Sequence, residues 1–363
     1  MLTGDDLYCK PPFQRVRKAW DATTLGAAVC FRKFDLEIQQ GWTGFSDLDI
    51  RFGQAYHSGA EALDRAFVAG KTQDEGTREA VEAALEVFCR GPVDPARPWE
   101  TAGRWRRMGD PNDPTFCNNY KNPVTLQRAM FWYAEDNWPG PVKPVKLPEG
   151  LFLPGMMAAA GSAAVEVSFR IPLPIRAPDG EPYILCGHLD GIGLFGGASW
   201  VRERKTTASS FGANYWKRWA PNVQVNTYDL AGALLLKGEK WLPPLAGVLM
   251  EACQVGVTFA RWERRGINRT DGLREQFLGE VCTIIKDAEA RATAAEAGSG
   301  KVAGLRVGPE GRWPANSRVC SLYGGCHFAP VCTRDPSKHQ EALMAAYRQK
   351  APWNPLTVRK EGD

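Results

Sequence analysis

The segment YILCGHLDGIGLFGGASWVRERKTT, residues 183–207, says most about how this chain folds. It predicts two strands, 183–195 and 199–207, joined by a turn at Phe195-Gly196-Gly197. A third strand, 165–173, precedes them in the sequence. The glycines also match the Gly-x-Gly-x-x-Gly signature of dinucleotide sites, but that signature needs a helix to begin there. Because a strand follows instead, we interpret the glycines as part of a hairpin.

The hairpin predicts where two acidic residues and a lysine lie. Side chains two residues apart in a strand share a face, so Glu203 and Lys205 project together and Arg204 projects the other way. Pairing of the two strands places Asp190 beside Glu203. Two carboxylates in one site repel unless a divalent cation neutralises them or one stays protonated. With a lysine to steady a water or a developing negative charge, this set meets the requirements of metal-assisted phosphodiester hydrolysis.

A turn aspartate and a solvated, charge-paired strand face are the alternative interpretation of the same residues. Two flanking patterns bear on the choice. Downstream, a helical pattern over 222–236 carries Gln224 and Tyr228 on one face, four residues apart. Upstream, a helical run offers His57, whose neutral imidazole can ligate a metal.

Two further residues compete for a place at this site. His188 lies two residues before the aspartate and therefore on the same strand face, so it rivals His57 as a ligand. Glu166 begins the first predicted strand and could support a metal through water, although surface charge is an equal explanation.

The four motifs follow one another in a fixed order: Gly53…His57, Gly187-His188-Leu189-Asp190, Glu203-Arg204-Lys205 and Gln224…Tyr228. In this order the chain resembles the RecB-like branch of the PD-(D/E)XK nuclease superfamily. The resemblance implies an α/β fold with a restriction-endonuclease-like core, in which helices flank a central mixed sheet. It implies a divalent-metal-dependent DNA nuclease, an exonuclease acting from ends. Asp190, Glu203 and His57 would hold Mg²⁺ or Mn²⁺, Lys205 would orient the attacking water, and Gln224 and Tyr228 would contact a phosphate or base.

The cysteines form a second pattern, CSLYGGCHFAPVC at residues 320–332. Cys320, Cys326 and Cys332 are separated by equal gaps of five residues, and glycine and proline between them suit a loop around one centre. Cys30 lies in a stretch that resembles the start of RecB-like nucleases with an iron–sulfur cluster, such as helicase-nucleases and nucleases of CRISPR adaptation. The resemblance implies a structural [4Fe–4S] cluster held by these four residues.

This cysteine pattern departs from the family in two ways. Phe31 stands where proline is common, and the first late gap is five residues instead of two. The second departure points to a separate, smaller branch, such as phages carry. Zinc is the rival ligand, since it also favours four cysteines, although its sites usually include ligands two to four residues apart. Unligated thiols are a third alternative, and Cys9 is the substitute if Cys30 is not a ligand.

Composition limits the classes of protein that fit. The 363 residues are 44% hydrophobic, enough for a large core, and the net charge is only +4. Contacts with DNA must therefore come from local patches. One such patch is YWKRW at 215–219, which mixes aromatic and basic residues as in segments that stack on single strands, although core packing is the commoner role of tryptophan. No long apolar run or leader is present, so we expect no membrane span and a cytoplasmic protein with reduced thiols.

The chain is expected to divide by role into four regions. These are an N-terminal arm and helical region (1–150), a nuclease core (151–300), the cysteine loop (301–335) and a basic tail (336–363). The expected partners are single- or double-stranded DNA ends and a helicase, recombinase or annealing protein, in DNA end processing, recombination or repair. A non-cleaving DNA-binding or assembly protein of the same fold, or a zinc-clasped adaptor, is the alternative function.

Overall fold

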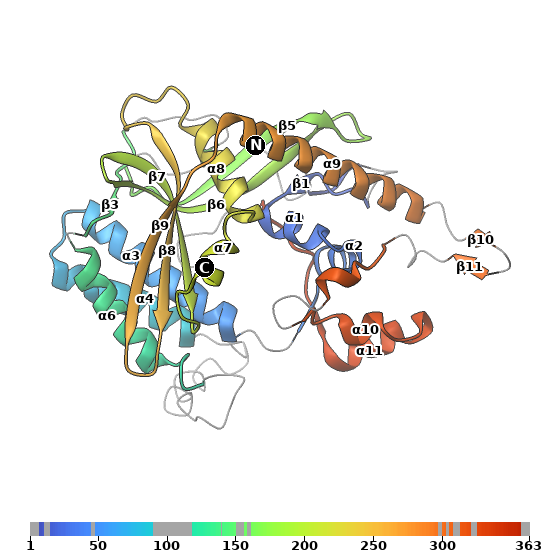
Figure 1. Ribbon diagram of the computed structural model, residues 1–363, viewed down its shortest axis with the longest axis horizontal. Helices are drawn as coiled ribbons and strands as arrows, with labels where there is room; N and C mark the ends of the chain where they lie inside the picture. The colour runs from blue at the N-terminus through green and yellow to red at the C-terminus, as the bar shows by residue number, and fades with distance from the viewer. Residues whose placement is uncertain are drawn as a thin grey trace. The chain divides into compact units, whose positions relative to one another are not determined.

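A mixed β-sheet with helices on both faces forms the centre of the protein (Figure 1). This computed structural model describes residues 7–10, 15–44, 48–89, 118–138, 140–149, 156–157, 161–296, 300–302, 305–307, 313–320 and 325–356. The sheet has eight strands in the order β4-β5-β6-β7-β8-β9, with β1 and β3 also paired to β6. Their bounds are β1 Ala19–Trp20, β3 Lys143–Pro144, β4 Met156–Met157, β5 Val165–Arg176, β6 Pro182–Phe195, β7 Ala198–Thr207, β8 Leu245–Val255 and β9 Ala260–Ile267. The α/β class and the flanked mixed sheet predicted from the sequence are thus confirmed.

The hairpin of β6 and β7 turns at two glycines. Phe195 pairs with Ala198, which leaves Gly196 and Gly197 as the turn, and their φ angles are +60° and +80°. Two successive positive φ angles define the tight turn whose twist matches a hairpin, and glycine adopts them without a steric cost. This local geometry confirms the predicted hairpin and excludes a helix at the glycine signature.

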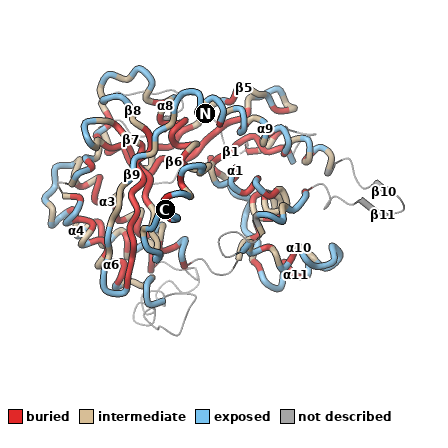
Figure 2. The backbone as a smooth tube through the Cα atoms, viewed as in Figure 1, coloured by how far each residue is buried: buried red, intermediate tan, exposed pale blue. Residues whose placement is uncertain are grey.

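β7 lies between a helix on one face and a group of helices on the other. On one face, Val201 meets α8 (Val223–Leu235), where a Cβ built on Gly232 would lie 2.5 Å from Val201 Cγ2. On the other face, Arg202 reaches Asp64 of α3 (Leu48–Val68). Since neighbouring residues in a strand point to opposite faces, α8 and α3 cover opposite sides of β7. Figure 2 shows the central strands as largely buried.

The helices on the α3 side pack into one hydrophobic cluster. α3, α4 (Gln73–Cys89) and α6 (Pro123–Asn137) contact one another and lie together in Figure 1. Phe52, Ala55, Tyr56 and Leu63 recur at helical spacing along α3 and are buried in this cluster. The result is a rigid helix that holds its other side chains at fixed places along the sheet.

The chain divides into two compact units. One contains residues 46–168 and 188–269, including β7, β8, β9 and the helices α3, α4, α6 and α8. The other contains residues 1–45, 169–187 and 270–363. Its elements include α1 Ala22–Ala28, α2 Phe31–Lys33, the π-helix Phe34–Gln39, β2 Trp42–Thr43, α9 Asp271–Glu296, β10 Gly300–Val302, β11 Leu305–Val307, α10 Ala329–Cys332, α11 His339–Ala346 and β12 Arg348–Gln349, with 3₁₀ turns at Ser317–Val319 and Pro336–Lys338. The four regions predicted by role stay a prediction.

None of the helices that the structure describes has the length and apolar character needed to cross a membrane.

Candidate active site

The end of the β6–β7 hairpin brings Asp190 to the backbone of β7. Its Oδ2 accepts the N–H of Arg204 at a distance of 2.7 Å. The regular ladder between the strands runs from the Phe195–Ala198 pair to the Gly191–Arg202 pair. The Asp190 carboxylate therefore accepts a backbone N–H of β7 just beyond the Gly191–Arg202 pair. This hydrogen bond fixes the position of the carboxylate.

His57 reaches the same place from α3. Its Nε2 lies 2.9 Å from the carbonyl oxygen of Arg204, and its Nδ1 lies 3.4 Å from Asp190 Oδ2. Gly53 lies one turn before His57 and faces β7. A Cβ built on Gly53 would lie 3.8 Å from Thr206 Oγ1, which is an ordinary contact distance. Burial lowers the pKa of His57, but the charge and hydrogen bond of Asp190 outweigh it, so that the pKa is raised. The imidazole therefore faces two oxygen groups that also bind divalent cations.

Three side chains converge closely enough to hold one metal ion. Ligand atoms of His57, Glu166 and Asp190 all lie within 4.8 Å of one another. Glu166 has a φ of +47°, a backbone conformation that a residue with a side chain rarely adopts and that marks local strain. One imidazole nitrogen and two carboxylate oxygens suit Mn²⁺ or Mg²⁺. The sequence left Glu166 undecided, and the structure places it in this group.

Glu203 lies on β7 as a fully buried carboxylate, with 0% exposure. It forms an ion pair and a charge-assisted hydrogen bond with Lys205, and no other donor among the residues that the structure describes reaches its oxygens. Burial raises the pKa of Glu203 to about 7, and the nearby Asp190 adds to this, while Lys205 opposes it. A buried carboxylate with so few donors costs free energy. Glu203, predicted as a metal ligand, is not among the three residues whose ligand atoms converge within 4.8 Å. Its carboxylate lies beside that group as an electrostatic neighbour of Asp190.

The pKa of Asp190 moves the other way. Burial raises it, but the charge and hydrogen bond of His57, the charge of Lys205 and the Arg204 N–H together hold it well below its usual range. The two carboxylates therefore differ because Asp190 accepts from His57 and the Arg204 N–H, whereas Glu203 has Lys205 as its donor and the charge of Asp190 against it. This asymmetry keeps Asp190 ionised and able to bind a cation at neutral pH.

Gln224 and Tyr228 approach this centre from α8. Asn222 caps the helix by accepting the N–H groups of Gln224 and Val225. Gln224 Nε2 donates to the Tyr228 hydroxyl at 3.3 Å. Burial raises the pKa of Tyr228 well above its ordinary value, and the charges of Glu203 and Asp190 raise it further. The phenol is therefore an electrostatic neighbour of both carboxylates, and the four predicted motifs meet in one place.

His188 has a different partner. Its Nδ1 lies 2.7 Å from Ser168 Oγ, and it is not among the three residues whose ligand atoms converge.

A buried network of ions on the opposite face of β7 was missed by the sequence reasoning. Arg202 donates to Asp64 at 2.8 Å and to Glu251 at 2.7 Å, and Arg204 also pairs with Asp64. Arg264 adds a bond to Glu251 at 3.2 Å. The alternation of Arg202 and Arg204 with Glu203 was a usable signal, as was Asp64 seven residues after His57 on the same helix. The network holds α3 against the strand that carries the site.

The four predicted cysteine ligands gather in the other compact unit. Cys30 Sγ accepts the N–H of Asn316 at 3.3 Å, and Cys320 Sγ lies 3.6 Å from the Asn316 carbonyl. The Cys326 N–H donates to the Cys320 carbonyl at 2.7 Å. Burial raises the pKa of Cys332, Arg32 lowers it, and the other three cysteines raise it, so the four thiols are electrostatic neighbours. All four are free thiols, and among the described part of the chain no three of their sulfur atoms lie within 4.8 Å of one another.

The chain matches no protein-family model and no curated protein.

Proposed function

We propose that this protein is a divalent-metal-dependent DNA nuclease of the RecB-like PD-(D/E)XK type that acts from DNA ends. The observation that carries the proposal is the convergence of Asp190, His57 and Glu166 beside the buried Glu203 and its ion-pair partner Lys205. A binding module has no need of a fully buried carboxylate whose one described donor is a lysine, because burying that charge costs free energy that a bound cation would offset.

Each residue of the site has a part in this chemistry. His57, Glu166 and Asp190 would hold Mg²⁺ or Mn²⁺, with the Arg204 carbonyl available beside them. Glu203, an electrostatic neighbour of Asp190, would complete the ligand set. When bound, the cation would polarise the phosphate and stabilise the leaving oxygen.

Lys205 keeps its proton because Glu203, Asp190 and Tyr215 raise its pKa, although burial lowers it. It therefore presents a fixed positive charge that can orient an attacking water. Gln224 and Tyr228 lie beside the carboxylates, where they can hydrogen-bond to the phosphate.

End-labelled single- and double-stranded DNA, incubated with the purified protein in Mn²⁺, in Mg²⁺ or in chelator, tests the proposal. We expect cleavage that requires the metal and is lost in Asp190→Asn. Asp49→Asn, an exposed aspartate on α3, is the matched control and should cleave normally. Metal-independent cleavage, DNA binding without cleavage, or full activity of Asp190→Asn would overturn it.

We further propose that Cys30, Cys320, Cys326 and Cys332 hold a [4Fe–4S] cluster. A tetrahedral zinc site with Zn–S bonds of about 2.3 Å holds its sulfur atoms only about 3.8 Å apart. Among the described residues, no three of these thiols come within even 4.8 Å of one another. The support for the cluster is that the four thiols are electrostatic neighbours within one compact unit.

A further inference from the structure

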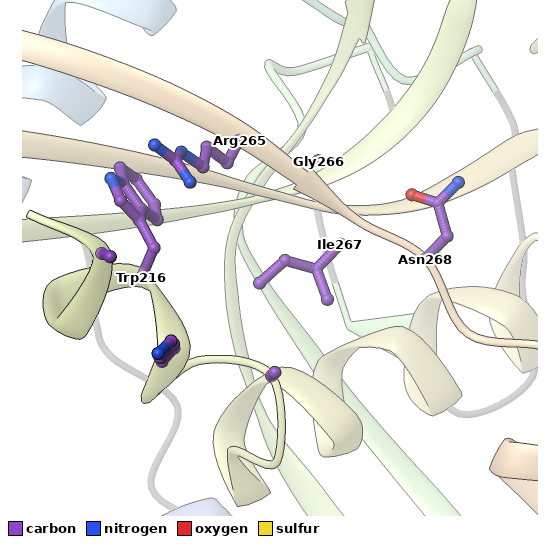
Figure 3. A pocket seen from close by; sticks show the side chains of 8 residues that line it. Trp216, Arg265, Gly266, Ile267 and Asn268 are labelled. Carbon is purple, nitrogen blue, oxygen red and sulfur yellow. The ribbon is translucent and has the colours of Figure 1, made fainter.

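An open pocket of about 540 Å³ lies beside α7 (Ala213–Lys217) and the end of β9. Figure 3 shows Arg265 over Trp216 at one end of it, Asn268 at the other end and Ile267 between them. Clefts of roughly 300–1,000 Å³ are the usual size for small organic ligands. A single nucleotide fits this space.

One aromatic ring and one guanidinium group, those of Trp216 and Arg265, line this pocket, and a second aromatic–arginine cluster lies next to them in the sequence. The Arg265 guanidinium lies 4.6 Å from the centre of the Trp216 ring. Behind it, Arg218 lies over both Tyr215 and Trp219, at 4.1 and 4.8 Å. Aromatic faces and guanidinium planes are the groups on which unpaired bases stack.

The charge of the pocket selects an anion. Lys217 and Arg265 are the charged members of the lining that the structure describes, and none of its residues is acidic. Lys217 is exposed, and the Arg265 side chain is half exposed and paired to Glu263 on the strand surface. A ligand with both an aromatic ring and a phosphate matches this combination of groups.

The pocket is close to the proposed reactive lysine. Tyr215 packs edge-on against Trp216, with ring centres 5.1 Å apart. Burial raises the pKa of Tyr215, while Arg218 and Lys205 lower it, so the phenol is also an electrostatic neighbour of Lys205. One aromatic residue thus separates the pocket wall from the candidate active site.

Trp216 also carries a donor without a partner. The residue is 7% exposed, and its indole N–H has no acceptor among the residues that the structure describes. A buried donor left unpaired is unfavourable, but Figure 3 shows this nitrogen on the side of the ring away from Ile267 and Asn268, so the pocket meets Trp216 at its other side. The segment predicted from the sequence as a stacking patch is therefore mostly packed, and only its Trp216 edge and Lys217 face the pocket.

We propose that this pocket binds one unpaired nucleotide of the DNA strand, with its base stacked at Trp216 and Arg265 and its phosphate at Lys217. The proposal rests on the proposed nuclease function, since it takes the neighbouring site as the place of cleavage. It makes single-stranded or frayed ends the preferred substrate class.

Fluorescence anisotropy on the full chain carrying Asp190→Asn measures binding without cleavage. The probes are a labelled oligothymidylate, an abasic strand of equal length and a blunt duplex. Arg265→Ala should raise the Kd for oligothymidylate about tenfold, the effect of losing one stacked base, and leave the abasic strand nearly unchanged. Lys217→Glu should weaken binding of both strands, whereas the equally exposed Lys237→Glu, the charge-matched control, should weaken neither.

Trp216→Ala should also weaken binding of oligothymidylate and not of the abasic strand. Because it removes a buried ring and could disturb the fold, the test depends on Arg265→Ala and Lys217→Glu, which change exposed residues. The proposal is overturned if they bind oligothymidylate as tightly as the parent, or if the parent binds the abasic strand equally well. Cleavage by the wild-type protein is scored separately. If the wild-type protein does not cleave DNA while the pocket variants weaken binding, the nuclease function is overturned and the nucleotide pocket stands. If the wild-type protein cleaves DNA and the pocket variants bind normally, only the pocket is overturned.

Discussion

A single side chain, Glu203, shows how the site trades stability for function. Among the residues described, its buried carboxylate has Lys205 as its one donor and counter-charge, and burial raises its pKa to about 7. Asp190, close by on the neighbouring strand, has donors and stays ionised. The cost of Glu203 is incurred in the metal-free protein and would be recovered on cation binding.

Replacing Glu203 by glutamine should therefore separate stability from activity. Glu203→Gln keeps the shape and removes the cost of a buried charge, but it also removes the counter-charge of the partly exposed Lys205. Because these effects oppose each other, we expect only a small change in the melting temperature of the metal-free protein. Nuclease activity should be lost, because an amide binds Mn²⁺ far less well than a carboxylate. Thermal melting in chelator and an end-labelled DNA assay check both outcomes. Glu275→Gln, at an exposed position on α9, should change neither. A large loss of thermal stability in Glu203→Gln would contradict the argument.

The two histidines give a sharper test of the ligand set. His57 Nδ1 faces Asp190, whereas His188 Nδ1 faces Ser168. We expect His57→Ala to raise the Mn²⁺ concentration needed for half-maximal cleavage by tenfold or more, on the order seen when a metal site is disturbed. His188→Ala should need no more Mn²⁺ than the wild type. Titration of Mn²⁺ at fixed DNA concentration measures this, and the opposite ranking would move the ligand to β6.

Local rules were enough to predict the residues on the hairpin. Asp190 and Glu203 could be brought together from strand alternation and one glycine turn. Asp64 and Glu251 could not, because their partners on β7 lie more than forty residues away in sequence, at separations of 138 and 49. Glu166 stayed undecided because its place depends on an unusual backbone angle, which no sequence pattern reveals.

At the scale of elements, the buried network joins α3 to the sheet. Arg202 and Arg204 project from β7 to Asp64 on α3, and Glu251 on β8 pairs with Arg202 and Arg264. The network holds the helix that carries His57 against the strand that carries Glu203. It therefore positions two motifs that the sequence separates by almost 150 residues.

Glu251 makes this network sensitive to acid. Burial raises its pKa, but Arg202, Arg204 and Arg264 lower it to about 2, below the usual glutamate value of 4.5. A group with a depressed pKa stabilises the fold fully above its unfolded value and loses that contribution as the pH falls through its folded value. We expect the free energy of unfolding to fall between about pH 4.5 and 2 as Glu251 is protonated.

Glu251→Gln should remove that part of the pH dependence. It should also lower the free energy of unfolding at pH 7 by about 3–5 kcal/mol, since it leaves buried arginines without their counter-charge. Urea unfolding at a series of pH values measures both effects. Glu275→Gln is again the matched control. An unchanged pH slope in Glu251→Gln would show that the network is not held by this charge.

Element boundaries followed the sequence wherever a turn or a cap sets them. The helix predicted over 222–236 is α8, Val223–Leu235, because Asn222 caps its first turn. The pairing of the two-residue strand β1 with Ile184 and Leu185 was not predicted. It depends on a contact between segments far apart in the chain, and neither strand encodes its partner locally.

At the scale of the whole molecule, the cysteine site joins the two ends of the sequence. Cys30 follows α1 and the other three cysteines lie at 320–332. Closing so long a loop can stabilise the fold by roughly 5 kcal/mol in the chain-entropy view. Cys326 and Cys332 also pack against a small core that includes Leu36, Trp42 and Phe328. A cluster here is best understood as a structural clasp.

This interpretation leads to a prediction about colour, metal content and stability. Protein purified without oxygen should be brown and contain about four iron atoms per chain, the content of the common Cys₄ cluster. Serine at Cys30, Cys320, Cys326 or Cys332 should bleach it and lower its melting temperature. Cys282→Ser, at a thiol of similar partial exposure on α9, should leave both unchanged.

The clasp makes one further demand, because a structural cluster need not exchange electrons with the substrate. Chemical reduction or oxidation that leaves the iron in place should therefore change the nuclease rate little, whereas loss of iron should lower the melting temperature. Iron analysis, the visible absorption spectrum and melting curves of the same samples check this. A colourless protein with one tightly bound zinc ion would overturn the cluster. The nuclease proposal would stand, because it rests on Asp190, His57, Glu166, Glu203 and Lys205 and not on the cysteines.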